Sequence, residues 1–320
     1  EMKRYYSSLN FRTRGQLVDS VFEAIRGLGI LGRLRELMPE KNYVYFADRA
    51  AFPYGNASEE YLGKRAEINL LRLSEAFRAE CVVIACNTLT AAAVGKLRKT
   101  FDFPVVGVEP SVIPAAKAFP EGKIYVFSTT FTSSSGRIAR RFASFKDRIE
   151  FIPTPRLAEL IEKLSPEKEI AKCISESAEG KIPEIYAGKA FPIVLGCTHY
   201  PLVKPIFRRI FPRAVIFDGT EGTARRVLSV ISEREKSEFV EENAGFGEKD
   251  SGLSEKDSGF PGNAETLVGH AFRGEEVRCR RFFAGGTRLF FVETVGGVKN
   301  SEKMSDLFAL YSCKDCLFTV

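Results

Sequence analysis

Several features that mark special classes of protein are missing from this chain of 320 residues. No apolar stretch approaches the roughly 18 residues of a membrane-spanning helix, and the first residues lead into no apolar signal segment. The seven cysteines are odd in number and their spacing forms no disulfide framework, which fits a reducing compartment. We therefore expect a cytoplasmic protein with no membrane association.

The chain also lacks the charge pattern of a nucleic-acid-binding protein. Its net charge is +6, but the basic residues are spread along the sequence, and no run of Lys and Arg is interleaved with aromatic residues. We expect anionic ligands to be favoured and no nucleic-acid partner. Hydrophobic content is 44% and charged content 28%, so the chain can bury the core of a globular protein.

The sequence does contain a regular alternation of short apolar runs and amphipathic segments. Such an alternation predicts βαβ units, and hence an α/β fold with mostly parallel sheets. It occurs in two successive series, which predicts two α/β lobes. The expected strands are residues 43–46, 81–85, 105–108, 124–127, 149–152, 193–195, 214–217, 282–283 and 289–292. The expected helices are residues 58–78, a helix capped by Thr88 or Thr90 that runs to 97, a helix capped by Thr132 that runs to 142, then 156–164, 166–178, a helix beginning near Pro201, 221–232 and 302–312.

Residues 235–264 interrupt this alternation. The sequence from Glu248 to Gly252 recurs from Glu255 to Gly259, and the whole stretch is charged and rich in Gly and Ser. Because such a composition buries little apolar surface, we predict a mobile surface insertion. The first 15 residues are expected to be a mobile extension.

Two cysteines stand in matching contexts at the ends of buried strands. Cys86 closes one apolar run and Cys197 closes another, and small polar residues follow each of them. In open α/β sheets, ligands bind at the carboxyl ends of the strands, and a nearby cation or helix N-terminus stabilises a thiolate there. Two thiols that face each other across a small ligand can remove a proton from one face and deliver one to the other. That reaction inverts a stereocentre without a cofactor, and His199 is placed to support proton transfer at Cys197.

The other cysteines and two competing motifs favour plainer interpretations. We expect Cys81, Cys173 and Cys279 to be small buried hydrophobes, and the CxxC pair at 313 and 316 to belong to an ordinary tail. Cys86, Cys197 and His199 could supply three zinc ligands, but the sequence offers no ligand pair at familiar close spacing except Cys197 and His199, so no metal is expected. Glycines at 27, 29 and 32 fit a dinucleotide motif with Asp48 beyond them. Residues 23–26 resemble helix or loop where that motif needs a strand, so no NAD is expected.

Around these cysteines the sequence resembles the aspartate/glutamate racemase superfamily, and its glutamate racemases in particular. The resemblance covers about residues 40–230 and is weak at both ends. Five segments carry it: Tyr45–Gly55, Ala85–Thr88, Ser128–Thr132, Leu195–Leu202 and Asp218–Arg225.

The resemblance implies two pseudo-symmetric α/β lobes with the active site in the cleft between them. The first lobe would comprise residues 1–111, completed by 220–320, and the second residues 112–219. The implied activity is cofactor-independent interconversion of L- and D-glutamate, which supplies D-glutamate for peptidoglycan synthesis. The implied acid/base pair is Cys86 and Cys197, assisted by Asp19 and His199. The implied substrate-binding residues are Ser20, Pro53, Tyr54, Gly55, Asn87, Thr88, Thr132 and Thr198.

The sequence departs from the family where the supporting Asp of the first cysteine is expected. Asp19 and Ser20 are present, but Val21 follows them where the family has a glycine, and a β-branched residue cannot easily adopt the conformations that glycine allows. Glu162 lies near a position where the family often has an acidic residue, yet we expect it to be a surface carboxylate of a helix.

Two other functions stay open on the sequence alone. The altered loop after Asp19 is compatible with a non-catalytic relative that binds an amino acid or a protein. The other function is a racemase that acts on aspartate, since aspartate presents the same α-carbon as glutamate. We expect a small-molecule substrate, glutamate, and count a homodimer among the possible assemblies.

Overall fold

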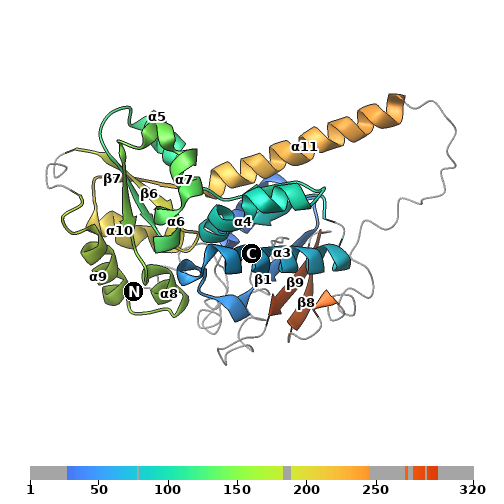
Figure 1. Ribbon diagram of the computed structural model, residues 1–320, viewed down its shortest axis with the longest axis horizontal. Helices are drawn as coiled ribbons and strands as arrows, with labels where there is room; N and C mark the ends of the chain where they lie inside the picture. Colours follow the sequence, from blue (N-terminus) through green and yellow to red (C-terminus); the bar gives the residue numbers. More distant parts are fainter. Residues whose placement is uncertain are drawn as a thin grey trace.

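The computed structural model describes residues 27–77, 79–182, 189–244, 271–272, 277–284 and 287–294. The described strands form mostly parallel sheets covered by helices, in two groups on the left and right of Figure 1. The predicted α/β class and its two lobes are therefore confirmed. Among these ranges, no helix is both long and apolar enough to cross a membrane. The first 15 residues, Asp19, Ser20 and the helix predicted at 302–312 lie outside them.

One lobe is built on a four-stranded sheet in the order β5-β4-β6-β7, in which every neighbouring pair is parallel. The strands β4 (Ile124–Ser128) and β6 (Phe191–Gly196) are buried along their whole length because helices cover both faces. β5 (Ile149–Pro153) and β7 (Ala214–Asp218) form the edges. The helices of this lobe are α5 (Val112–Ala118), α6 (Thr130–Ser134), α7 (Gly136–Arg141), α8 (Leu157–Glu162), α9 (Glu167–Ala178) and α10 (Lys204–Ile210), with 3-10 turns η3 (Ala143–Phe145) and η5 (Tyr200–Val203).

The other lobe combines strands from both halves of the chain. β2 (Val82–Ile84) pairs in parallel with β3 (Val105–Gly107). β1 (Tyr43–Ala47) pairs in parallel with β9 (Thr287–Thr294), and β8 (Val277–Ala284) adds to β9 in antiparallel orientation. The two strands predicted near the C-terminus are thus confirmed as parts of a longer hairpin. The helices of this lobe are α2 (Leu28–Leu37), α3 (Glu59–Ala76), α4 (Asn87–Thr100) and α11 (Thr220–Ala244), with 3-10 turns η1 (Arg49–Ala51) and η2 (Tyr54–Asn56).

The two predicted threonine caps are wrong. α4 begins directly after Cys86, whose extended backbone occupies the cap position without a side-chain cap, and Thr90 instead donates its hydroxyl to the Ile84 carbonyl at 3.2 Å. α6 is capped by Thr129, which accepts from the Thr132 backbone N–H at 3.2 Å. The backbone of Ser135 leaves the helical conformation, so α6 and α7 replace the single helix predicted to run to 142.

The helix predicted at 221–232 extends much further, as α11, through Ala244 (Figure 1). The predicted insertion at 235–264 is therefore wrong for its first ten residues, and the rest lies outside the described ranges. Glu is the commonest residue in that first part, and Glu is a strong helix former even where little apolar surface is buried.

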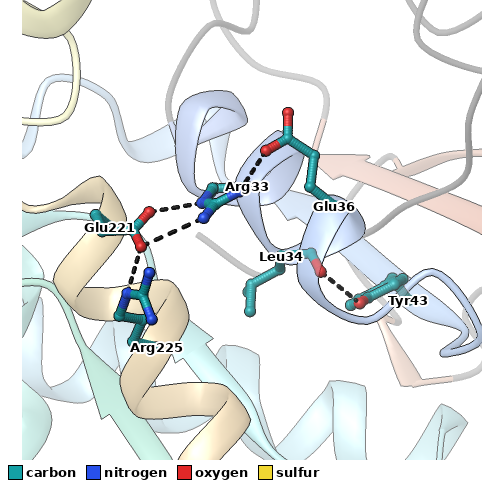
Figure 2. A network of polar contacts seen from close by, with 6 residues as sticks. All are labelled: Arg33, Leu34, Glu36, Tyr43, Glu221 and Arg225. Carbon is teal, nitrogen blue, oxygen red and sulfur yellow. Dashed lines mark hydrogen bonds and ion pairs between the residues drawn. The ribbon is translucent and has the colours of Figure 1, made fainter.

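Ion pairs fasten the start of α11 to α2 (Figure 2). The Arg33 guanidinium contacts Glu221 at 2.6 Å and Glu36 at 2.7 Å, and Arg225 donates to the same Glu221 carboxylate. At the far end of α2, the Tyr43 hydroxyl donates to the Met38 carbonyl at 2.7 Å. These exposed ion pairs are each of small energetic value, and they connect the first turn of α11 to α2.

The chain crosses between the lobes at two places that pack against each other. The Ser111 hydroxyl donates to the Asp218 carbonyl at 2.6 Å. A Cβ added at Gly219 would lie 2.6 Å from a methyl of Val108 and 2.9 Å from the Glu109 carbonyl oxygen, so only glycine fits there. This tight crossing sets the relative placement of the two strand-end cysteines.

Candidate active site

Both cysteines lie at the carboxyl ends of parallel strands, as predicted. Cys86 comes two residues after β2 and directly precedes α4, where it is partly buried; Cys197 directly follows β6 and is buried. A Cβ at Gly196 would lie 3.0 Å from the Phe127 carbonyl and 3.2 Å from Ser128 Cβ, so the residue before Cys197 is held tightly against β4. The positive end of α4 favours an anionic sulfur at Cys86.

Cys197 belongs to a chain of three polar side chains. Its Sγ lies 3.6 Å from Nδ1 of His199, and Nε2 of His199 lies 2.8 Å from Oε2 of Glu162. All three are largely buried, with side-chain exposure of 5% for His199 and 13% for Glu162. With Nε2–H donated to the carboxylate, Nδ1 is free to accept the thiol proton or, once protonated, to donate to the thiolate.

The position of Glu162 overturns our expectation of a surface carboxylate. Glu162 is the last residue of α8, and that helix end carries its side chain inward to His199. The sequence pattern around it is an ordinary amphipathic helix. A carboxylate that approaches the imidazole from 37 residues away leaves no local signal in the sequence.

Three threonine hydroxyls meet at the junction of the lobes. Thr88 Oγ1, in the first turn of α4, lies 2.9 Å from Thr129 Oγ1 and 3.5 Å from Thr132 Oγ1. Thr129 and Thr132 are joined at 3.0 Å, and all three side chains are buried. The structure thus brings the predicted Thr88 and Thr132 together and adds Thr129, which the sequence analysis had missed. Its position in the hydroxyl-rich segment 128–132 was the available signal.

The loop from Phe52 to Gly55 lies against the second lobe. The Phe52 and His199 rings are 6.1 Å apart between centroids, and a Cβ at Gly55 would be 3.5 Å from the Thr129 side chain. Pro53 is exposed, and the Phe52–Pro53 peptide bond is cis. The Tyr54 side chain turns inward and is 3% exposed, so this residue presents its backbone to the junction.

The remaining predicted residues divide into placed and unplaced ones. Asn87 is buried at the start of α4 and donates to the Val108 carbonyl at 3.4 Å, while Thr198 is partly buried between Cys197 and His199. Asp19 and Ser20 lie outside the described residues. Their role therefore stays a prediction.

The other described thiols have the surroundings of structural cysteines. Burial raises the pKa of the Cys81 thiol to about 12, and burial likewise raises the pKa of Cys173. Neither thiol is therefore suited to act as a thiolate near neutral pH.

The competing motifs are also placed by the structure. Within the described ranges, no group of three or more His, Cys, Asp or Glu side chains is arranged to hold a metal ion. The glycine pattern at 27–32 opens α2, with Gly27 in a left-handed conformation at its N-cap. Asp48, which a dinucleotide site would need for a ribose, is buried and paired with Arg65 at 2.6 Å.

Comparison with known proteins identifies relatives with one consistent description. The family model described as Asp/Glu/Hydantoin racemase matches residues 29–227. A glutamate racemase of Pseudomonas syringae pv. tomato is 34% identical over 223 residues, covering 66% of this chain and 78% of that protein. A glutamate racemase of Pseudomonas paraeruginosa is 36% identical over 220 residues, covering 67% and 81%.

Solved structures agree with this description. The glutamate racemase of Escherichia coli, in complex with L-glutamate and the activator UDP-MurNAc-Ala, superimposes with a TM-score of 0.56 at 29% identity, covering 66% of this chain and 80% of that one. The glutamate racemase of Thermus thermophilus, in complex with beta-chloro-D-alanine, gives a TM-score of 0.52 at 26% identity, covering 67% and 79%.

Proposed function

The chain belongs to the Asp/Glu/hydantoin racemase family, and we propose that it is a glutamate racemase that interconverts L- and D-glutamate without a cofactor. The observation that carries this proposal is the pair of strand-end cysteines, one of them linked to a buried His199–Glu162 pair, beside a cluster of threonine hydroxyls. Relatives named glutamate racemase at 34–36% identity support the choice of substrate.

In the proposed reaction the thiolate of one cysteine removes the Cα proton of glutamate and becomes a thiol. The opposing thiol then donates its own proton to the other face of the planar carbanion and becomes a thiolate. The product has the opposite configuration. One sulfur has gained the Cα proton of the substrate, and the other has lost its own proton to the product. Cys86 and Cys197 therefore exchange roles between the two directions of the reaction, and no external oxidant or reductant enters.

The surroundings of the two sulfurs suit this exchange. His199 would take up the proton of Cys197 and leave an ion pair of imidazolium and thiolate, which Glu162 stabilises from the other side of the ring. At Cys86 the N-terminus of α4 would stabilise the thiolate.

The same placement supports a proposed set of substrate-binding residues. The hydroxyls of Thr88, Thr132 and Thr198, the Asn87 amide and the loop of Pro53, Tyr54 and Gly55 are proposed to hold the carboxylates and ammonium group. Asp19 and Ser20 are proposed to complete the Cys86 side. Both lie outside the segment that the family model matches, which begins at residue 29.

The wider setting of this function is also a proposal. Residues 1–111 with 220–320 would form the Cys86 lobe, and residues 112–219 the Cys197 lobe. The product D-glutamate would serve peptidoglycan synthesis in the cytoplasm, and a homodimer is the assembly that we would test first.

Circular dichroism of L-glutamate incubated with the purified, reduced protein tests the proposal. We expect the signal to decay to zero, because the two enantiomers have equal free energies and racemisation ends at equal amounts. L-aspartate in a parallel sample should retain its signal. A folded, reduced protein that leaves L-glutamate unchanged would contradict the proposal. Calorimetric binding of glutamate without inversion would then identify a non-catalytic binding protein.

A further inference from the structure

A buried carboxylate outside the catalytic residues is held by four side chains. Asp48 Oδ1 accepts from Arg65 at 2.6 Å and from Thr294 at 3.1 Å. Oδ2 accepts from Arg65 at 2.8 Å, from Tyr54 at 2.5 Å and from Asn69 at 3.0 Å. Burial acts to raise the Asp48 pKa, but the hydrogen bonds from Arg65 and Tyr54 outweigh it and keep the pKa below its ordinary value. Asp48 is therefore a fixed anion with both oxygens occupied, unsuited to proton transfer.

This carboxylate fastens the loop that reaches the lobe junction. Asp48 directly follows β1 and accepts a hydrogen bond from the Tyr54 hydroxyl, and Tyr54 directly precedes Gly55, which packs on Thr129. At the start of the loop, the backbone N–H of Ala50 donates to the Thr294 hydroxyl at 3.2 Å. The loop is thus held at both ends by one buried cluster.

Thr294 joins this cluster from a distant part of the chain. It is the last residue of β9, is 1% exposed, and lies one position beyond the Ala47–Glu293 pair of the β1–β9 ladder. Its hydroxyl donates to Asp48 and accepts from Ala50, so one side chain connects β9 to both the carboxylate and the loop backbone. β9 lies beyond the matched family segment, which ends at residue 227.

We propose that Asp48 and Thr294 are positioning residues that set the Phe52–Gly55 loop for substrate binding, with Thr294 as the contribution of the C-terminal strand. This inference rests on the proposed function. A buried ion pair adds little net stability compared with apolar packing of the same volume, whereas a fully bonded network holds its members in one arrangement. Asn69 directs its amide nitrogen at Asp48 while its buried amide oxygen accepts no bond from the described residues, an arrangement that favours orientation of the carboxylate over stability.

The test compares Thr294→Val with a matched control, Tyr43→Phe. Valine keeps the shape of threonine and removes both hydrogen bonds. Tyr43→Phe also removes one hydroxyl with two carbonyl partners from the same sheet, but at the opposite end of β1. We expect Thr294→Val to raise KM for glutamate about tenfold with kcat changed less than about twofold, the result of losing binding that is equal in ground and transition states. Tyr43→Phe should lower Tm to a similar degree without changing KM.

Rescue and a second variant complete the experiment. Thr294→Ser restores the hydroxyl and should return KM toward the wild-type value, which a purely steric role would not produce. If Thr294→Val does not fold, Tyr54→Phe removes the bond at the other end of the loop and should raise KM in the same way.

The outcomes separate this inference from the proposed function. Active wild-type protein with KM unchanged in Thr294→Val, or in Tyr54→Phe where that variant replaces it, would overturn the positioning role alone. Wild-type protein that neither racemises nor binds glutamate in calorimetry would overturn both proposals. If glutamate binds without turnover, the dissociation constant replaces KM in the same comparison.

Discussion

The two strand-end cysteines occupy equivalent places in the two lobes, but their described surroundings differ. Cys197 is buried and lies 3.6 Å from an imidazole that is itself bound to a carboxylate. Cys86 is partly buried and takes the cap position of a 14-residue helix. The described surroundings of Cys197 thus include a titratable imidazole, and those of Cys86 include the fixed dipole of a helix, to which Asp19 is proposed to add a carboxylate.

This difference teaches that one reaction can be supported by unlike means on its two sides. A racemase needs each sulfur to exist both as thiol and as thiolate, since the roles exchange with direction. An imidazole stores a proton and releases it, whereas a helix N-terminus only stabilises charge. Changes to the two halves should therefore have different signatures.

Removal of either thiol should have the largest effect and should not distinguish the halves. We expect Cys86→Ala and Cys197→Ala each to reduce inversion by more than about 10³-fold, because each removes an acid/base group from one face of the substrate. Polarimetry or circular dichroism measures the rate. Cys173→Ala, which removes a thiol with a raised pKa in the Cys197 lobe, should retain wild-type activity. Retained inversion in either active-site variant would break the two-thiol account.

His199→Gln should sharpen the comparison, since it changes the support of Cys197 alone. We expect kcat/KM to fall about 10²-fold, within the usual range for a lost acid/base group. The loss should be equal in the two directions, because the equal free energies of the enantiomers fix the ratio of the two kcat/KM values. Glu162→Gln keeps the size of the side chain and an oxygen that can accept the His199 hydrogen bond, so kcat/KM should fall less, about tenfold. A His199→Gln variant as active as wild type would mean that Cys197 needs no imidazole.

Asp48→Asn should affect the stability of the Cys86 lobe. The partly buried Arg65 guanidinium then loses its ion pair with the Asp48 carboxylate, so we expect the free energy of unfolding to fall by about 3 kcal/mol in urea denaturation. The low pKa of Asp48 contributes stability above the unfolded-state pKa of about 3.9, and that contribution is lost as the pH falls through the lower folded-state pKa. In Asp48→Asn, the free energy of unfolding should no longer show this part of the decrease at acid pH. An acid unfolding profile unchanged from wild type would contradict the assignment.

Two glycine substitutions should give the smallest effects, with opposite signs. Gly196→Ala places a Cβ 3.0 Å from the Phe127 carbonyl, so we expect a loss of about 1–3 kcal/mol and a shift of the adjacent Cys197 that lowers activity. Gly95 lies within α4, the helix that begins after Cys86. A Cβ added there meets nothing within 4 Å, so Gly95→Ala should stabilise the helix by about 0.5–1 kcal/mol. Thermal unfolding and activity assays of both variants check this pair.

The sequence predicted the elements better than their ends. Strand positions followed from apolar runs such as Val82–Ile84 and Phe191–Gly196, which are buried on both faces. Caps failed because a threonine near a helix start can bond elsewhere, as Thr90 does to Ile84. α11 is longer than predicted because its last residues form a helix through their intrinsic helix propensity, and no regular apolar pattern marks that part in the sequence.

Within the candidate site, the strand-end placement of the two cysteines and the position of His199 next to Cys197 were predicted and agree with the structure, whereas contacts between residues far apart in the sequence were not predictable. The Glu162–His199 contact spans 37 residues and the Thr294–Asp48 contact 246, so neither leaves a local pattern. The Tyr54 hydroxyl points into the core, a direction that depends on where Asp48 is buried. Such contacts follow from packing between elements, which periodicity does not encode.

The most direct test of the central claim follows deuterium during the first few per cent of racemisation in D₂O. Two separate thiols predict that newly formed D-glutamate carries deuterium at Cα while the remaining L-glutamate keeps its original proton. This is expected because the thiol on the opposite face has already exchanged with solvent. Deuterium that enters the unconverted L-glutamate as fast as the product would indicate one group acting on both faces, and would contradict the assignment of Cys86 and Cys197 as opposing partners.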